Sequence, residues 1–354
     1  MKKSFLILVT LVMMSANVFA DGLTATLQQG DKMTPFYGVD AFKNAYAAAD
    51  SGAVITLSAG AFNIVNSIDK PMKLVGNFGL DASSVERTIL SSLAINANKV
   101  TIDGIYFSGN LTLGNISDCK ISHSWIEDTL KYSSTESWHT NTVIDQCVIK
   151  TETAIKQGKN YTVKNSTINK FSELNTSSNI AYISNCVIYT FVYNHSGPSS
   201  AGSTYNPSVP VAIYKNNVLG VDVTDYYYFG YSDYYYHYYN IYFSGPSEFY
   251  YNMFPINHYN YSKSASSKTT INYLAGCTNI GNTKTEWSSC LTSSQYPSTP
   301  KNPGNGQDGT LRGPQGGTGF SLYPNIPRIT SSTIDSSTDN DGKLNVTIKV
   351  SVPQ

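Results

Sequence analysis

Ile183-Ser184-Asn185-Cys186-Val187-Ile188 is the clearest copy of a phrase that recurs along the chain. Two other copies begin at Ile102 (Ile-Asp-Gly-Ile-Tyr-Phe) and at Ile144 (Ile-Asp-Gln-Cys-Val-Ile). Each copy begins and ends with an apolar residue, and these two residues stand five positions apart. Further copies begin at Ile116, Val163 and Ile213, and a weaker one begins at Phe249. This recurring phrase decides the expected fold.

The phrase predicts two short strands joined by a one-residue bend. Side chains of a flat strand alternate with a period of two, so the two apolar ends would face opposite sides without a bend. A bend at the third position lets both ends and the fourth residue point inward. Residues that tolerate a left-handed backbone hold that position in four copies, as Gly104, Asp118, Asn165 and Asn185. The other three copies have Gln146, Lys215 and Tyr251, which suit the bend less well.

Stacked copies of the phrase predict an all-β solenoid, a right-handed parallel β-helix over residues 21–294. The shortest regular spacing between copies is about 20 residues, and longer spacings indicate insertions. The fourth positions then form one interior column: Ile105, Cys119, Cys147, Ser166, Cys186, Asn216 and Asn252. Because a solenoid needs closed ends, we expect a cap at its N-terminus. The apolar stripe of residues 38–50 predicts a capping helix there.

The opening of the chain after this helix resembles the pectin-lyase-like right-handed β-helix superfamily. The resemblance rests on Gly-Ala-Val-Ile-Thr-Leu-Ser-Ala-Gly-Ala-Phe from Gly52, on Lys-Pro-Met-Lys-Leu-Val-Gly from Lys70, and on the later repeats to about residue 255. The chain is also similar to uncharacterised β-helix proteins secreted by Bacteroidetes. The superfamily implies cleavage of polysaccharides by a lyase or a glycosidase. However, the sequence has no Asp-Asp step and no arginine between Arg87 and Arg312, so the superfamily's catalytic signatures are missing.

The first 20 residues have the pattern of a secretory signal peptide. Lys2 and Lys3 precede an apolar stretch, and Val-Phe-Ala ends at Ala20, where we expect cleavage. The mature protein is therefore expected outside the cytoplasm, in the periplasm, at the cell surface or in the medium. Lys plus Arg and Asp plus Glu both number 24, which gives no basis for binding nucleic acid. No later stretch is long and apolar enough to predict a membrane span.

The five cysteines divide into two groups. Cys119, Cys147 and Cys186 stand in the repeat, where thiols are expected to pack as small apolar groups. Cys277 and Cys290 lie outside it, and a disulfide between them is plausible in an exported protein. No Cys-x-x-Cys or Cys/His spacing predicts a zinc site, and no cofactor is expected.

A polar cluster at residues 123–139 is the best candidate for a catalytic site. Its histidines suit proton transfer, its carboxylates suit acid–base chemistry, and its indoles suit sugar stacking. The candidates for catalysis are His123, Glu127, Asp128, Glu136 and His139, with Trp125 and Trp138 as sugar contacts. The alternative is a loop insertion whose tryptophans pack on the body of the β-helix. The lysines between residues 150 and 170 are a second candidate for the base of a lyase, and the alternative, which we favour, is that they are solvated surface side chains.

Residues 226–261 form a Tyr-rich insertion with 14 tyrosines and 4 phenylalanines. Some of these rings must face solvent in any register, and exposed rings suit glycan or protein contacts. The proposed contact residues are Tyr228, Tyr231, Tyr235, Tyr236, His237 and Tyr239. The alternative is an insertion that covers the side of the β-helix or mediates self-association.

The C-terminal region predicts a linker and a β tail. Residues 295–322 are rich in Pro and Gly, and residues 323–354 hold two alternating stretches around Asp341-Gly342, which suggest a hairpin. Taken together, the sequence predicts a secreted, non-catalytic β-helix that carries carbohydrate-binding or adhesion functions. Its partner would be a polysaccharide or a surface protein. The alternative is a lyase or glycoside hydrolase acting on a uronate-containing or other plant or host polysaccharide.

Overall fold

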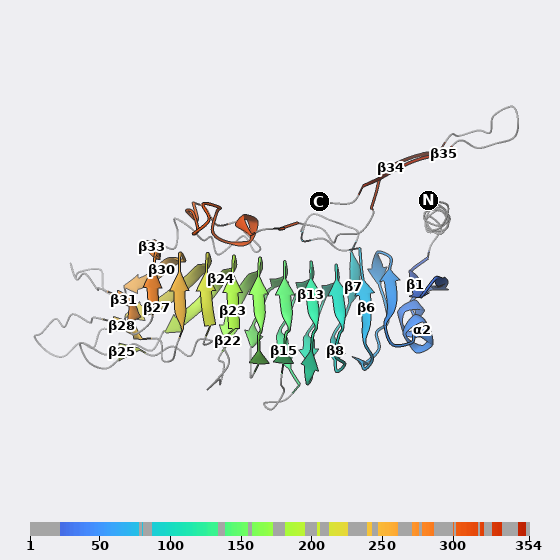
Figure 1. Ribbon diagram of the computed structural model, residues 1–354, viewed down its shortest axis with the longest axis horizontal. Helices are drawn as coiled ribbons and strands as arrows, with labels where there is room; N and C mark the ends of the chain where they lie inside the picture. Colours follow the sequence, from blue (N-terminus) through green and yellow to red (C-terminus); the bar gives the residue numbers. More distant parts are fainter. Residues whose placement is uncertain are drawn as a thin grey trace, which may run out of the picture.

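The computed structural model describes residues 22–77, 80, 87–133, 139–154, 158–172, 181–194, 204–205, 212–225, 239–242, 247–260, 271–275, 278–286, 300, 302–317, 319–321, 328–334 and 346–351. These residues form a long body in which short strands stack side by side along one axis (Figure 1). The predicted signal peptide, residues 1–20, lies outside the described residues.

The first sheet runs the length of this body and contains 12 strands of the described chain. Its neighbours from β3 onward pair in parallel, whereas β1 pairs antiparallel with β2 and β3. The strands are β2 (Lys32–Tyr37), β1 (Thr24–Gln29), β3 (Ala53–Leu57), β6 (Met72–Val75), β9 (Thr101–Asp103), β13 (Lys120–Ser122), β17 (Val143–Asp145), β21 (Thr162–Lys164), β23 (Ala181–Ser184), β26 (Ala212–Lys215), β29 (Glu248–Tyr250) and β32 (Thr278–Ile280).

The second sheet contains 15 strands of the described chain. They are β4 (Gly60–Ala61), β5 (Ser67–Ile68), β7 (Thr88–Leu90), β8 (Leu93–Ile95), β10 (Tyr106–Phe107), β11 (Leu111–Leu113), β14 (Trp125–Ile126), β15 (Leu130–Tyr132), β18 (Val148–Ile149), β19 (Thr153–Ala154), β22 (Thr167–Ser172), β24 (Val187–Asn194), β27 (Val218–Asp225), β30 (Met253–Asn260) and β33 (Thr283–Glu286).

Three smaller sheets complete the described part. One holds β12 (Ile116–Ser117), β16 (His139–Thr140) and β20 (Gly158–Lys159), and another holds β25 (Thr204–Tyr205), β28 (Tyr239–Tyr242) and β31 (Ile271–Ala275). The last is the antiparallel hairpin of β34 (Arg328–Ile334) and β35 (Val346–Ser351). These strands lie within the predicted β tail.

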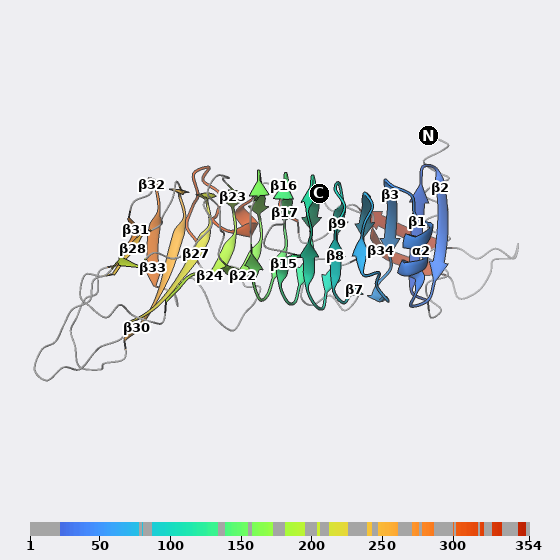
Figure 2. The same cartoon turned by 90° about the horizontal axis from the view of Figure 1, so that it is seen from below.

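The chain visits the sheets in a fixed order. From β9 in the first sheet it passes through β10 and β11 in the second sheet and β12 in a small one, and returns to β13 beside β9. Ile102 therefore pairs in parallel with Ile121 of the next circuit. Figure 2 shows the circuits as successive rungs along the axis. This topology confirms the predicted all-β class with long parallel sheets and is compatible with a parallel β-helix.

At the N-terminal end, the hairpin of β1 and β2 is followed by helix α2 (Ala41–Ala48). The helix lies inside the stretch for which we predicted a capping helix. Its residues Ala41, Phe42 and Ala45 are buried, and they join the same apolar cluster as Ala25 and Leu27 of β1. The helix thereby extends the core beyond the first parallel strands.

The predicted bends occur where the first sheet passes into the second. Every described rung from β9 to β32 has one residue with a left-handed backbone directly after its first-sheet strand. They are Gly104, His123, Gln146, Asn165, Asn185, Asn216, Tyr251 and Gly281, with φ between 44° and 71°. We call this row the bend column. Even Gln146 and Tyr251, which suit this conformation less well, adopt it, because the buried residues on both sides fix the backbone.

Two of the predicted repeat copies need correction. In the copy at Ile213, the inward residue is Tyr214, which is fully buried, and the bend falls on Asn216 instead of Lys215. Asn217, and not Asn216, therefore takes the interior position. The copy at Ile116 belongs to a different corner, between β12 and β13, where Asp118 has a φ of 57°. Cys119 thus does not share a column with Cys147 and Cys186.

The corrected interior column has a regular backbone ladder. Thr167 donates to the Cys147 carbonyl at 2.9 Å, and Val218 donates to the Cys186 carbonyl at 2.8 Å. The column continues as Asn217, Asn252 and Asn282, whose side-chain amides hydrogen-bond from rung to rung. Beside it, Tyr214 stacks on Phe249 with ring centroids 4.7 Å apart. The core therefore changes from aliphatic in the middle of the body to aromatic and amide-rich near its C-terminal end.

Candidate functional site

A buried His–Asp pair lies at the start of the predicted catalytic cluster. His123 is in the bend column after β13, and its Nδ1 lies 2.7 Å from Asp103 Oδ1 of the preceding rung. The Ser122 hydroxyl donates to the same carboxylate oxygen at 3.0 Å. Asp103 and His123 are 9% and 6% exposed. His123 Nε2 is also buried and has no hydrogen-bond partner among the described residues.

Asp145 holds the equivalent position two rungs further on. Lys164 Nζ lies 3.3 Å from its Oδ2, and Lys120 Nζ lies 3.7 Å from the same oxygen. The Asn165 side-chain amide, from the bend column, donates to Asp145 Oδ1 at 3.1 Å. Asn165 thus contacts Asp145 in the same way that His123 contacts Asp103. This repetition indicates that both bend residues stabilise the turn from the first sheet into the second.

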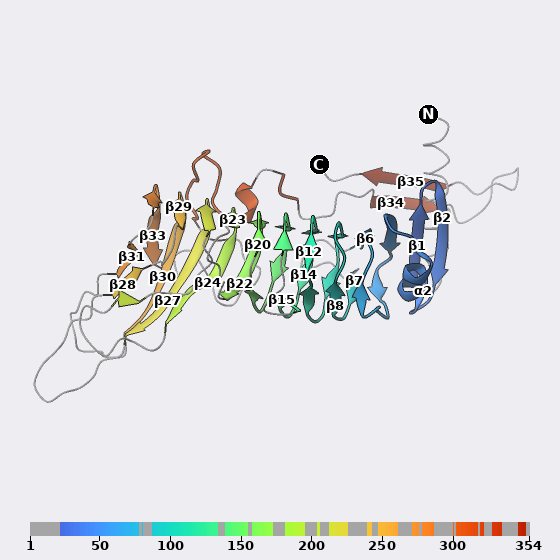
Figure 3. The ribbon, with the colours of Figure 1, turned by 60° about the horizontal axis from the view of Figure 1, so that its bottom comes forward.

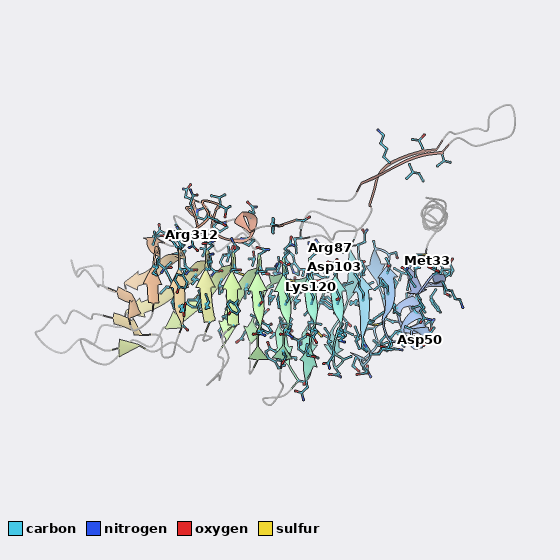
Figure 4. All side chains as sticks on the ribbon, viewed as in Figure 1. Met33, Asp50, Arg87, Asp103, Lys120 and Arg312 are labelled. Carbon is cyan, nitrogen blue, oxygen red and sulfur yellow. The ribbon has the colours of Figure 1, made fainter. Side chains whose placement is uncertain are left out.

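Asp103, Ser122, Asp145 and Lys164 are successive residues of one register column along the outer edge of the first sheet. Figure 4 places Asp103 and Lys120 in the middle part of the body. The sequence analysis did not single out Asp103 or Asp145. Both are the second residue of a repeat copy, and that position faces outward just before the bend. This pattern was the signal that would have identified them.

Glu127 lies outside the second sheet, at the end of β14. Its Oε2 accepts hydrogen bonds from the Trp125 indole at 2.7 Å and from the Tyr106 hydroxyl at 3.0 Å, while Lys150 forms an ion pair with Oε1. Burial raises the pKa of Glu127, but the bonds from Lys150, Trp125 and Tyr106 outweigh it and hold the pKa below its ordinary value. Glu127 is therefore a well-paired carboxylate and not a proton donor at neutral pH.

The cation next to this cluster is Arg87. Its guanidinium carbon lies 5.1 Å from the centre of the Tyr106 ring, a cation–π arrangement. The hydrogen bond to Glu127 and burial raise the pKa of the Tyr106 hydroxyl, burial being the larger cause. Tyr106 is thereby kept as a neutral donor to Glu127.

His139 points into the core and not toward Glu127. It is fully buried on β16, and its ring lies 4.2 Å from that of Tyr132 between centroids. Neither ring nitrogen has a hydrogen-bond partner among the described residues. Burial lowers the pKa of His139 to about 4, so the ring is neutral at physiological pH.

The structure therefore does not assemble the predicted cluster into one site. His123 lies at a corner, Glu127 outside the second sheet and His139 inside the core, and no hydrogen bond or ion pair joins them in the described part of the chain. Asp128 contacts only its neighbour Thr129, whose hydroxyl lies 3.2 Å away, among the bonds of the described residues. Glu136 and Trp138 lie outside the described residues.

Of the other predicted site residues, the structure describes the side chain of Trp125 and the backbone of Tyr239. Trp125 is 7% exposed and packs with Leu80 and Val148, so its ring is turned to other side chains. Tyr239 is the first residue of β28, and only its backbone is described. The rest of the proposed contact set (Tyr228, Tyr231, Tyr235, Tyr236 and His237) lies outside the described residues, as do Cys277 and Cys290.

Cys119, Cys147 and Cys186 are buried free thiols. The Cys186 thiol donates to the Ser184 carbonyl at 3.2 Å, and that of Cys147 to the Asp145 carbonyl at 3.4 Å. Burial raises the pKa of both Cys147 and Cys186 to about 12. These groups are packing elements that are protonated at neutral pH.

Three further observations bear on function. Comparison of the chain with protein-family models, curated proteins and solved structures finds no match. Within the described residues, no group of three or more His, Cys, Asp or Glu side chains is placed to hold a metal ion. Over the same residues, no helix has the length and apolar character needed to cross a membrane. A proposal of function therefore rests on the geometry of the described side chains.

Proposed function

We propose that the chain is a secreted right-handed parallel β-helix, related to the pectin-lyase-like superfamily, that binds a glycan or a surface protein outside the cell without cleaving it. The observation that carries this proposal is the state of the carboxylates. Asp103, Asp145 and Glu127 each already have a cation or a histidine and further donors around them. Hydrolysis of a glycosidic bond needs a carboxylic acid held protonated beside a second carboxylate.

A binding surface is available on the outer face of the first sheet. Register places Lys120, Val143, Thr162, Tyr182 and Ile213 in one outward column, one residue per rung. Tyr182 is 47% exposed, and an exposed ring offers a flat apolar face with a polar tip. Parallel strands lie about 4.8 Å apart, so the column is a regular ladder suited to an extended polymer.

The binding proposal is tested with Tyr182→Ala. Purified protein is applied to an array of neutral and uronate-containing glycans, and we expect binding that falls at least tenfold in the variant. Tyr37→Ala, at an exposed tyrosine of β2 outside this column, serves as the matched control and should leave binding unchanged. Binding that is unchanged in Tyr182→Ala and lost only after truncation of the Tyr-rich insertion would move the contact surface from the sheet to residues 226–261.

The alternative, a polysaccharide lyase or glycoside hydrolase, is favoured by a different observation. Lys120 and Lys164 flank Asp145, and His123 and Asp103 lie on the same edge of the first sheet. A lyase needs a base beside a uronate, and a lysine or histidine is suited to that role. The protein is incubated with uronate polymers, and new double bonds and reducing ends are measured. Cleavage that disappears in both Lys164→Ala and His123→Ala would replace the binding proposal by this one.

A further inference from the structure

An apolar stripe lies on the outer face of the second sheet, opposite the core. Register aligns Trp125, Val148, Thr167, Val187, Val218 and Met253 on successive rungs. Their chain neighbours Ile126, Ile149, Ile168, Ile188, Leu219 and Phe254 belong to the main core. Because side chains alternate along a strand, the stripe residues face outward. Yet all six are at most 8% exposed.

The cover over this stripe comes from residues 300, 302–317 and 319–321, which we call the strap. Phe320 packs on the cluster of Leu80, Trp125 and Val148. Gly313 and Gly304 lie beside Val187 and Met253, and an added Cβ would be in van der Waals contact with their side chains, at 3.4 Å and 3.7 Å. Figures 1 and 3 show the strap running along the body from the β33 end back toward its middle. It thus crosses the rungs in the direction opposite to their order in the sequence.

The strap is held by polar contacts to the bend column. The Gln307 backbone N–H donates to Asn216 Oδ1, and that of Gly313 donates to the Asn216 carbonyl, each at 3.0 Å. At its far end, the Ser321 N–H donates to Gln146 Oε1. Two bend residues, Asn216 and Gln146, thereby accept hydrogen bonds from the backbone of the strap.

Arg312 is the main side-chain anchor of the strap. It is 6% exposed, and its guanidinium donates to the carbonyls of Tyr251, Gly281 and Pro303 and to the Thr283 hydroxyl. Figure 4 places it over the end of the body that holds β30 and β33. The planar fork of an arginine suits several carbonyl oxygens at once, which a lysine cannot match.

The Gly-rich composition of the strap follows from its close approach. A Cβ on Gly317 would lie 1.7 Å from Asn165 Oδ1, and one on Gly306 would lie 2.5 Å from the Asn216 side chain. Glycine lets the backbone come near enough for the hydrogen bonds. The predicted linker composition therefore reflects a fitted contact in this stretch.

We propose that the stripe and the bend column together form a peptide-binding track, occupied in this structure by the strap, whose partner in another molecule is a glycine- and proline-rich segment that turns as the strap does, at the Asn305–Leu311 bridge and the short helix Pro314–Gly316, and carries one buried arginine. The strap shows the chemistry that the track accepts: backbone N–H groups for the bend residues, an arginine for the carbonyls near Tyr251 and Gly281, and an aromatic ring for Trp125. Displacement of the strap opens the track. This surface is separate from the outer face of the first sheet.

The first test uses the unaltered protein and native-state hydrogen exchange. We expect the strap amides of Gln307, Gly313 and Ser321 to exchange at least tenfold faster than the ladder amides of Val187 and Val218, because the strap opens while the sheets stay closed. Equal rates, with all five amides exchanging only through global unfolding, would show that the strap is a fixed part of the core and would overturn the proposal.

The second test uses a labelled synthetic peptide of residues 300–321 as the probe. We expect Phe320→Ala in the full chain to loosen the strap and to bind the peptide at least tenfold more tightly than the unaltered protein does. Leu311→Ala, in the same segment but at a side chain that is 47% exposed, is the matched control and should leave binding unchanged. A peptide with R312A should bind at least tenfold more weakly than the natural one.

Three results would contradict the proposal in the second test. They are equal binding of a scrambled peptide, no gain of peptide binding in a variant whose strap amides exchange freely, and a gain of glycan binding in place of peptide binding. If Phe320→Ala fails to fold, Arg312→Lys provides a milder loosening, since it keeps the charge and loses the fork.

Discussion

Asn217 and Asn252 occupy successive rungs of the interior column, and the Asn217 backbone N–H donates to Asn252 Oδ1 at 3.0 Å. The Asn252 side-chain amide in turn donates to the Tyr214 carbonyl at 2.9 Å and to Asn282 Oδ1 at 2.9 Å. One side chain thus satisfies two backbone groups of the preceding circuit and bonds to a side chain of the next one. The column links the circuits by side-chain bonds in addition to the sheet ladder.

We therefore expect Asn252→Ala to destabilise the protein by about 2–4 kcal/mol, because it leaves a buried N–H and a buried carbonyl without partners. Asn252→Ser should recover part of this loss, since Ser166 already accepts the Cys147 N–H at 3.0 Å in an equivalent rung. Thermal unfolding followed by circular dichroism measures the difference. Asn44→Ala, at an exposed position of α2, is the control, and a midpoint as low as that of Asn252→Ala would contradict the role of the column.

His139 predicts a pH dependence of stability. Burial lowers its pKa from 6.5 to about 4, so the neutral ring contributes stability that is fully present above pH 6.5 and is lost as the pH falls toward 4. The shift corresponds to about 3 kcal/mol. His139→Phe should lack this component, and its unfolding midpoint should fall less than that of the unaltered protein between pH 7 and pH 4.5. Parallel curves for the two proteins would argue against a neutral buried ring.

The environments of the cysteines predict how many thiols react with a thiol reagent. Cys147 and Cys186, whose pKa burial raises to about 12, and the buried Cys119 should not react with a thiol reagent in the native protein at pH 8. In denaturant without reductant, three thiols should react if Cys277 and Cys290 form the predicted disulfide. A count of five reactive thiols would show that this disulfide is absent. Fast reaction of the three buried thiols in the native protein would show that the core opens readily.

Glu127 is expected to have a structural role. Its ordinary pKa is 4.5 and its folded-state pKa is lower, so its stabilising effect is present above pH 4.5 and is lost as the pH falls through the folded-state value. Its side chain is 32% exposed, so solvent screens the ion pair and Glu127→Gln should cost only about 1 kcal/mol. Asp128→Asn is the matched control. Loss of a glycan-cleaving activity in Glu127→Gln, with stability intact, would reassign Glu127 to catalysis.

Part of this architecture follows from local sequence. The phrase around Cys186 and Ile144 predicted strands, bends and inward residues, because a left-handed residue between two apolar positions leaves few conformations open. In the copy at Ile213, the predicted bend and inward positions lie one residue too early in the sequence. Ile and Tyr alternate there, and only the pairing of Tyr214 with Ile183 across rungs decides which one faces the core.

The candidate site was less predictable. Residues 123–139 are close in sequence, but the chain turns corners within this stretch, so His123 ends at a corner, Glu127 outside the second sheet and His139 inside the core. Neighbours in space come instead from the previous or next rung, as Asp103 does for His123. The strap is the extreme case, since Ser321 contacts Gln146 across 175 positions. Composition alone gave no indication of that contact.

The strap also has a consequence for the order of folding. Rungs need only the segment synthesised just before them, so the sheets can grow progressively as the chain emerges, by local pairing. The outer stripe from Trp125 to Met253 must wait for the strap, which follows every one of those rungs in the chain. Until the strap has been synthesised, this face remains an exposed apolar surface. A ribosome-bound chain that ends before the strap would thus carry an apolar face that is open to association with other chains.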